Sequence, residues 1–114
     1  MVKVEILTSL VLKIKKKFSN TEANEIIDLL YTLEDNPHKG KLLGTVGGVL
    51  IKELKYKKFR FYFLGDGYKL KIFSTEELND MLLRFVRMSD KKEQQKTIEE
   101  IKQILKIIGP DGFD

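Results

Sequence analysis

The apolar residues of this chain recur at two spacings, which divide it into helical and extended stretches. A spacing of three and four residues, typical of one face of an α-helix, runs through residues 10–18, 23–33 and 98–108. Short apolar or alternating runs at residues 2–7 and 49–73 have the period of β-strands. The pattern therefore predicts a first strand, two helices, a meander of strands and a final helix.

Residues that start and stop helices support this division. Ser19 lies three residues before Glu22, as in the capping box of a helix N-terminus. The run Asp35-Asn36-Pro37 stops the same helix, so a helical hairpin is expected in the N-terminal third. The other predicted boundaries are Thr8 or Ser9 for the first helix, and Ser89 or Asp90 with Gly109-Pro110 for the last.

The extended part of the chain is predicted to form a meander, and the Gly-rich residues 38–48 before it a loop. A helical hairpin and a last helix packed with an antiparallel sheet define an α+β fold, here as one domain over residues 1–114. The predicted strands are Val49 to Lys55, Lys58 to Leu64, Tyr68 to Phe73 after a hairpin signal at Gly65-Asp66-Gly67, and Met81 to Arg87, with a helix as the alternative for the last.

Alternation along the second meander strand separates two faces of the sheet. Phe59, Phe61 and Phe63 share one side, and we expect them in the core because three exposed phenylalanines would promote aggregation. Arg60 and Tyr62 then point to the opposite face, which is expected to meet water. The neighbouring strands offer further cations for that face: Lys52, Lys55, Lys69 and Lys71.

The charge distribution sharpens this expectation. The chain has a net charge of +4, and its middle third, residues 38–71, holds nine basic and two acidic residues. A concentrated basic patch favours a polyanion such as nucleic acid, and a solvated lysine-rich surface is the alternative.

Other classes of protein are disfavoured by what the sequence lacks. There is no cysteine and a single histidine, so disulfides, thiol nucleophiles and transition-metal sites are excluded, and no cofactor is indicated. Charges interrupt the first apolar run, and no run approaches the roughly 18 apolar residues of a membrane span. We therefore expect no membrane association and a reducing, cytoplasmic environment.

Several short motifs resemble the RelE/ParE superfamily of toxins from type II toxin–antitoxin systems. They are Asn36-Pro37 after the helical hairpin, the Gly/Lys loop, Ile51-Lys52-Glu53-Leu54-Lys55 and Phe59-Arg60-Phe61-Tyr62-Phe63. Residues 84–95 are similar to the basic run before the last helix of the HigB-type branch. The resemblance covers about residues 20–108 and is closest to the RelE/HigB-like branch.

The resemblance implies a RelE-like (microbial-RNase-like) fold, ribosome-dependent cleavage of mRNA and a cognate antitoxin that blocks the site. Arg60 matches the strand arginine that contacts the scissile phosphate, and Lys52 and Lys55 match basic residues of the preceding strand. Lys91 and Lys92 match the basic pair of the HigB-type run. The C-terminal tyrosine and the histidine that relatives use have no counterpart here.

Cleavage of this kind begins when a 2′-hydroxyl attacks the neighbouring phosphate, so the site needs a cation and a base. Arg60 suits the phosphate, and the candidate bases are Lys52, Lys55 and Lys91, with Glu53 as a carboxylate alternative. Contacts to RNA are expected from Tyr62, Lys69, Lys71, Arg84, Arg87 and Lys92. The alternatives are a non-catalytic ParE-like gyrase inhibitor, a relative that only binds RNA or its antitoxin, and a general nucleic-acid-binding domain.

Overall fold

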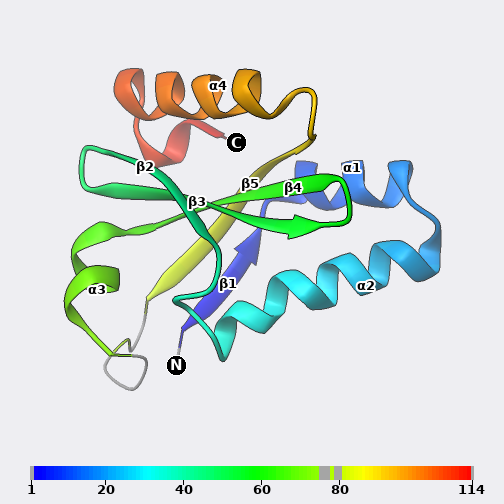
Figure 1. Ribbon diagram of the computed structural model, residues 1–114, viewed down its shortest axis with the longest axis horizontal. Helices are drawn as coiled ribbons and strands as arrows, with labels where there is room; N and C mark the ends of the chain where they lie inside the picture. The colour runs from blue at the N-terminus through cyan, green and yellow to red at the C-terminus, as the bar shows by residue number, and fades with distance from the viewer. Residues whose placement is uncertain (1, 75–77, 79–80, 114) are drawn as a thin grey trace.

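The computed structural model describes residues 2–74, 78 and 81–113, which form an α+β structure around one sheet (Figure 1). Its elements in chain order are β1 (Lys3–Ile6), α1 (Thr8–Lys17), α2 (Asn20–Tyr31), η1 (Thr32–Glu34), β2 (Lys41–Val46), β3 (Val49–Tyr56), β4 (Phe59–Asp66), α3 (Gly67–Ile72), β5 (Leu82–Asp90), α4 (Gln94–Ile107) and η3 (Pro110–Phe113).

The predicted helical hairpin is confirmed. Ser19 caps α2, and its side-chain oxygen accepts a hydrogen bond from the backbone N–H of Glu22 at 3.2 Å. The predicted cap of α1 is wrong, because the helix begins at Thr8 and its N-cap is Leu7, which supplies no side-chain hydrogen bond. Both helices turn their apolar stripes inward, with Ile14 of α1 and Ile26 of α2 fully buried.

The sheet has the strand order β1-β5-β4-β3-β2 and is mixed rather than purely antiparallel. β1 pairs in parallel with β5, whereas every other pair is antiparallel. Parallel neighbours need a long connection, and here that connection is the whole chain between the two strands. Local periodicity carries no signal for this pairing.

The Gly-rich region that was predicted as a loop contains the edge strand β2. It pairs with β3 through a two-residue turn in which Gly47 and Gly48 have φ of 56° and 80°, as a tight hairpin requires. A register shift between Leu42 and Gly44 interrupts the alternation of β2. That irregularity explains why the strand has no clear period in the sequence.

The strand predicted from Tyr68 to Phe73 is instead the helix α3. Asp66 caps it, because its Oδ1 accepts a hydrogen bond from the backbone N–H of Lys69 at 3.1 Å. The apparent alternation is misleading, since Leu70 is buried but Tyr68 and Ile72 are exposed. The last predicted strand is confirmed as β5, and it continues to Asp90.

The phenylalanine stripe of β4 packs under the helical hairpin, as predicted. The rings of Phe18 and Phe59 lie 4.9 Å apart, and Phe63 lies 4.9 Å from Phe85 of β5. The opposite face, predicted to meet water, is covered by α4, whose buried stripe includes Ile98 and Ile101. The sheet therefore lies between two helical layers, as Figure 1 shows.

A bulge in β5 decides which of its side chains belong to the α4 face. The register of β4 and β5 shifts by one residue between Tyr62 and Phe63, so Tyr62 lies opposite Arg87 and Leu64 opposite Arg84. Two arginines three residues apart, which a regular strand would place on opposite faces, thus share one face.

Docking of α4 on the sheet gives the first prediction. Ile101 is fully buried, so Ile101→Ala is expected to lower the free energy of unfolding by about 2–5 kcal/mol. Gln103→Ala, an exposed change on the same helix, is expected to stay within about 0.5 kcal/mol. Urea unfolding measures both, and equally small effects would contradict the packing of α4 on the sheet.

Candidate nucleic-acid interface

The predicted water-facing surface around Arg60 and Tyr62 is wrong, because both side chains lie beneath α4. Arg60 is 8% exposed, and its Nε lies 3.8 Å from Oε2 of Glu53. Glu53 in turn accepts a hydrogen bond from Nε2 of Gln94, on the first turn of α4, at 3.1 Å. The guanidinium is thus part of a buried ion pair and is not accessible to a phosphate.

Tyr62 is equally inaccessible. Its side chain is fully buried, and its hydroxyl shares a hydrogen bond of 2.8 Å with Oγ of Ser89 on β5. Burial raises the pKa of the Tyr62 hydroxyl. The ring therefore cannot stack on a base in this arrangement.

The predicted strand lysines do not gather on one surface. Lys52 lies on the phenylalanine face, where its Nζ donates a hydrogen bond to the backbone oxygen of His38 at 3.0 Å. Its ammonium lies 5.8 Å from the centre of the Phe63 ring, and burial lowers its pKa. Lys55 is exposed on the other face, while Lys69 and Lys71 lie on α3, beyond the far end of β4.

The predicted RNA contacts Arg84 and Arg87 hold the C-terminal elements against the sheet. Arg84 forms an ion pair of 3.0 Å with Glu5 and donates to the backbone oxygen of Pro110 at 3.0 Å. Arg87 forms an ion pair of 2.8 Å with Glu100 of α4, and its guanidinium lies 5.1 Å from the centre of the Phe113 ring. Both arginines therefore have structural partners.

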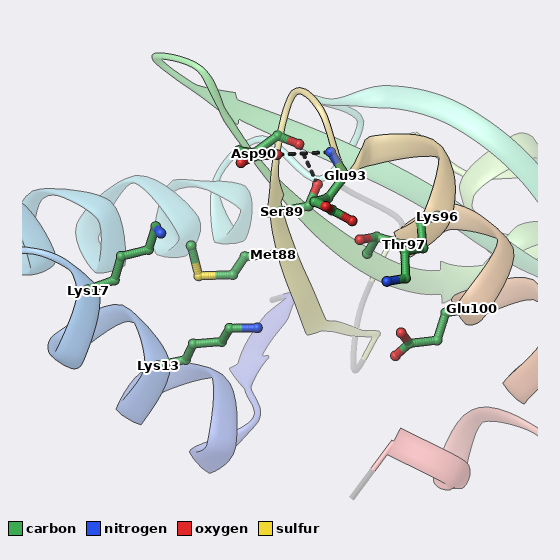
Figure 2. A pocket seen from close by; sticks show the side chains of 9 residues that line it. All are labelled: Lys13, Lys17, Met88, Ser89, Asp90, Glu93, Lys96, Thr97 and Glu100. Atoms are coloured by element: carbon green, nitrogen blue, oxygen red, sulfur yellow. Dashed lines mark hydrogen bonds between the residues drawn. The ribbon is translucent and has the colours of Figure 1, made fainter.

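A groove runs along β5 between α1 and α4, and Figure 2 shows its central part. β5 forms the floor, and the two helices form the walls. This central part has a volume of about 300 Å³ and is lined by Lys13, Lys17, Met88, Ser89, Asp90, Glu93, Lys96, Thr97 and Glu100.

The groove continues beyond both ends of this central part. At one end, Lys17 and Asp90 also line a hollow formed with Lys58, Phe59, Lys91 and Lys92. At the other end, Lys13 and Met88 also line a hollow that reaches Arg87 and Phe113. The three hollows share lining residues and form one continuous groove, named here the α1–α4 groove.

Lysines dominate the charge of the α1–α4 groove. Three acids also line it: Asp90 Oδ1 accepts from the backbone N–H of Glu93 at 2.9 Å, Glu100 pairs with Arg87, and Glu93 is exposed. In the described part of the chain, no carboxylate lies within 4 Å of the ammonium of any groove lysine. These six lysines are Lys13, Lys17, Lys58, Lys91, Lys92 and Lys96.

Among the residues predicted for the site, the groove contains Lys91 and Lys92, and Arg87 at its far end. The other four lysines were missed. Lys13 and Lys17 are four residues apart, as are Lys92 and Lys96, so helical spacing places each pair near one side of its segment. That signal is in the sequence, but nothing local shows that α1 and α4 face each other across β5.

Chemically, the α1–α4 groove can bind an extended anion. Lysine side chains line its walls, and the hydroxyl of Thr97 can donate a hydrogen bond, whereas the hydroxyl of Ser89 already donates to the backbone oxygen of Asp90 at 2.9 Å. No helix in the described ranges is long and apolar enough to cross a membrane. Comparison with models of protein families, with curated proteins and with solved structures gives no match.

The buried ion pair gives a second prediction. Arg60→Ala leaves the Glu53 carboxylate buried without its cation, so we expect stability to fall by about 3–5 kcal/mol. Adding Glu53→Gln removes the orphaned charge and is expected to restore a large part of the loss. A double-mutant cycle from urea unfolding measures this coupling, and strictly additive losses would show that the two groups do not interact.

Lys52 gives a third prediction, on pH dependence. Its folded pKa lies below the unfolded value of about 10.4, so between the two values the unfolded chain binds more protons and stability rises with pH. The charged amine therefore lowers stability most at neutral pH. The free energy of unfolding of Lys52→Met, relative to that of the wild type, is therefore expected to be higher at pH 7 than at pH 10.5.

Urea unfolding at several pH values measures the free-energy difference between Lys52→Met and the wild type. The hydrogen bond to His38 favours the charged amine and opposes the lowering of its pKa, so the net downward shift sets the sign of the slope. Lys55→Met corrects for the removal of an exposed lysine from the same strand. A difference that is flat with pH would contradict the burial of the ammonium.

Proposed function

We propose that this chain binds RNA in the α1–α4 groove, as the toxin of a toxin–antitoxin pair of the RelE/HigB-like kind. One observation carries the proposal: six lysines from separate segments line a single groove, and none of them pairs with a carboxylate of the described residues. Like charges held together repel one another, and a polyphosphate that binds among them relieves this repulsion and releases its own counterions.

The order of the elements supports the more specific assignment. A helical hairpin, Asn36-Pro37, a run of antiparallel strands and a basic segment before the last helix follow the order that the sequence motifs imply. Lys91 and Lys92, the predicted basic pair, lie at the mouth of the α1–α4 groove between β5 and α4. The RNA surface that we propose is therefore the seam between helices and not the sheet face.

We further propose metal-independent cleavage of ribosome-bound mRNA as the activity. The 2′-hydroxyl loses its proton to a base and its oxygen bonds to phosphorus. The bond from phosphorus to the 5′-oxygen of the next nucleotide breaks, and that oxygen takes a proton from a charged groove lysine, which gives a 2′,3′-cyclic phosphate and a 5′-hydroxyl. Lys91 is the one candidate base from the sequence that lines the groove, so we place this role there and not at Lys52.

The fourth prediction tests this function through two groove lysines, Lys58 and Lys92. The double variant Lys58→Ala/Lys92→Ala is expected to bind single-stranded RNA roughly tenfold more weakly. The slope of log affinity against log salt should fall by about 0.7 for each phosphate that the variant no longer neutralises. Fluorescence anisotropy across a salt series measures both quantities.

The matched control is Lys15→Ala/Lys106→Ala, which removes the same charge from exposed positions outside the groove. It is expected to bind RNA nearly as the wild type does. Equal losses of affinity in the two double variants would show that net charge, and not the groove, determines binding.

Induced expression tests the toxin activity itself. The wild-type chain is expected to stop growth and to fragment translated mRNA, and the product of the neighbouring gene should restore growth. Lys58→Ala/Lys92→Ala should neither stop growth nor fragment mRNA. Growth arrest with intact mRNA would overturn the proposed cleavage, and unaffected growth would overturn the assignment as a toxin.

A further inference from the structure

One aromatic ring lies among the lysines at the end of the α1–α4 groove. Phe59 begins β4, and it is the one apolar residue in the described lining of the hollow formed with Lys17, Lys58, Asp90, Lys91 and Lys92. Four lysines therefore line the same hollow as a single aromatic ring.

The core covers only part of the Phe59 ring. Phe61 and Phe63 share the same face of β4 and are fully buried, whereas Phe59 is only half-buried and lies where the core ends. Each square ångström of apolar surface left in water forgoes about 25 cal/mol. The part of the ring that the core leaves uncovered is apolar surface that a ligand can bury.

The ring is also held in place before any ligand arrives. Phe18 packs perpendicular to it, with 4.9 Å between ring centres and 84° between planes, and Lys17 Nζ lies 5.4 Å from its centre. Tyr56 is its partner on β3. A ring held by Phe18 and Lys17 loses little conformational freedom on binding, which favours affinity.

A planar ring beside several ammonium groups matches the two parts of a nucleotide. Lysines bind the phosphate, and an aromatic side chain stacks on a base, which contributes about 1–3 kcal/mol per base. Bases within a duplex are already stacked and paired, so only an unpaired base can reach such a ring. An acidic peptide would use the lysines but has no need of the ring.

We propose that Phe59 forms a nucleobase subsite, so that the α1–α4 groove selects single-stranded RNA with a base free to stack. This inference rests on the proposed function, because it assumes that RNA phosphates occupy the lysines. It adds the class of RNA and the residue that distinguishes it.

The test, our fifth prediction, is a thermodynamic cycle between the protein and the RNA. Affinities are measured for the wild type and Phe59→Leu, each with a short single-stranded RNA and with the same strand made of abasic nucleotides. The wild type is expected to bind the strand with bases roughly tenfold more tightly. Phe59→Leu should lose that advantage and bind the abasic strand as the wild type does.

Three further measurements keep the result specific. Phe59→Tyr retains an aromatic ring and should restore the preference for bases. Duplex RNA should bind Phe59→Leu and the wild type equally. Thermal unfolding shows whether Phe59→Leu is folded. Unchanged affinity of the variant for the abasic strand shows independently that the groove is intact.

The outcomes separate this inference from the proposed function. The nucleobase subsite alone would be overturned if Phe59→Leu lost as much affinity for the abasic strand as for the strand with bases. An equal loss of affinity for duplex RNA, or for polyglutamate as a polyanion without bases, would have the same meaning. The subsite would also be overturned if the wild type bound the strand with bases and the abasic strand with equal affinity. If the wild type binds no RNA, both the proposed function and this inference fail.

Discussion

The central strand β4 is buried on both faces, and this constraint determines where the chain can place its charges. From Arg60 to Leu64 every side chain lies against one of two helical layers. A charge in that position needs a partner, since burying an unpaired ion costs several kcal/mol. Arg60 therefore pairs with Glu53, Tyr62 bonds to Ser89, and Gln94 of α4 completes the set from above.

Because helices cover both faces of the sheet, the lysines without a carboxylate partner in the described residues lie along the helices and in the turns between elements. Lys13 and Lys17 lie in the second half of α1, and at its last turn the helix dipole favours positive charge. Lys58 is on the β3–β4 turn, and Lys91 and Lys92 are on the connection from β5 to α4. These segments meet along β5 because β5 lies between β1, which leads into α1, and β4. The sheet order thus assembles the α1–α4 groove.

Local periodicity was sufficient for α1, α2, β3, β4 and α4, because each has a clear apolar period and, for α2, a cap. It failed at α3, where capping by Asp66 outweighs a period-two pattern, and at β2, where a bulge removes the period. The buried phenylalanine face of the sheet could be predicted, but the packing of α4 over Arg60 on the opposite face was missed. The signal existed, since the apolar stripe of α4 needs a surface, and one face of the sheet was still open to receive it. The groove depends on contacts between distant segments, which no local spacing encodes.

The separation of Arg60 from the α1–α4 groove also bears on the proposed chemistry. The floor residue Ser89 is both the register partner of Arg60 and the hydrogen-bond partner of Tyr62, so the buried polar cluster lies directly behind the groove. Its charges are neutralised by pairing, so in the proposed function the lysines of the groove attract the RNA. The groove exists only while α4 is docked, because α4 supplies one wall. RNA that binds there must therefore stabilise the docked helix, by about 2.7 kcal/mol when its concentration is a hundred times the Kd. Under the proposed function, RNA binding and the integrity of the polar cluster are thus linked, although the proposed RNA site does not include Arg60.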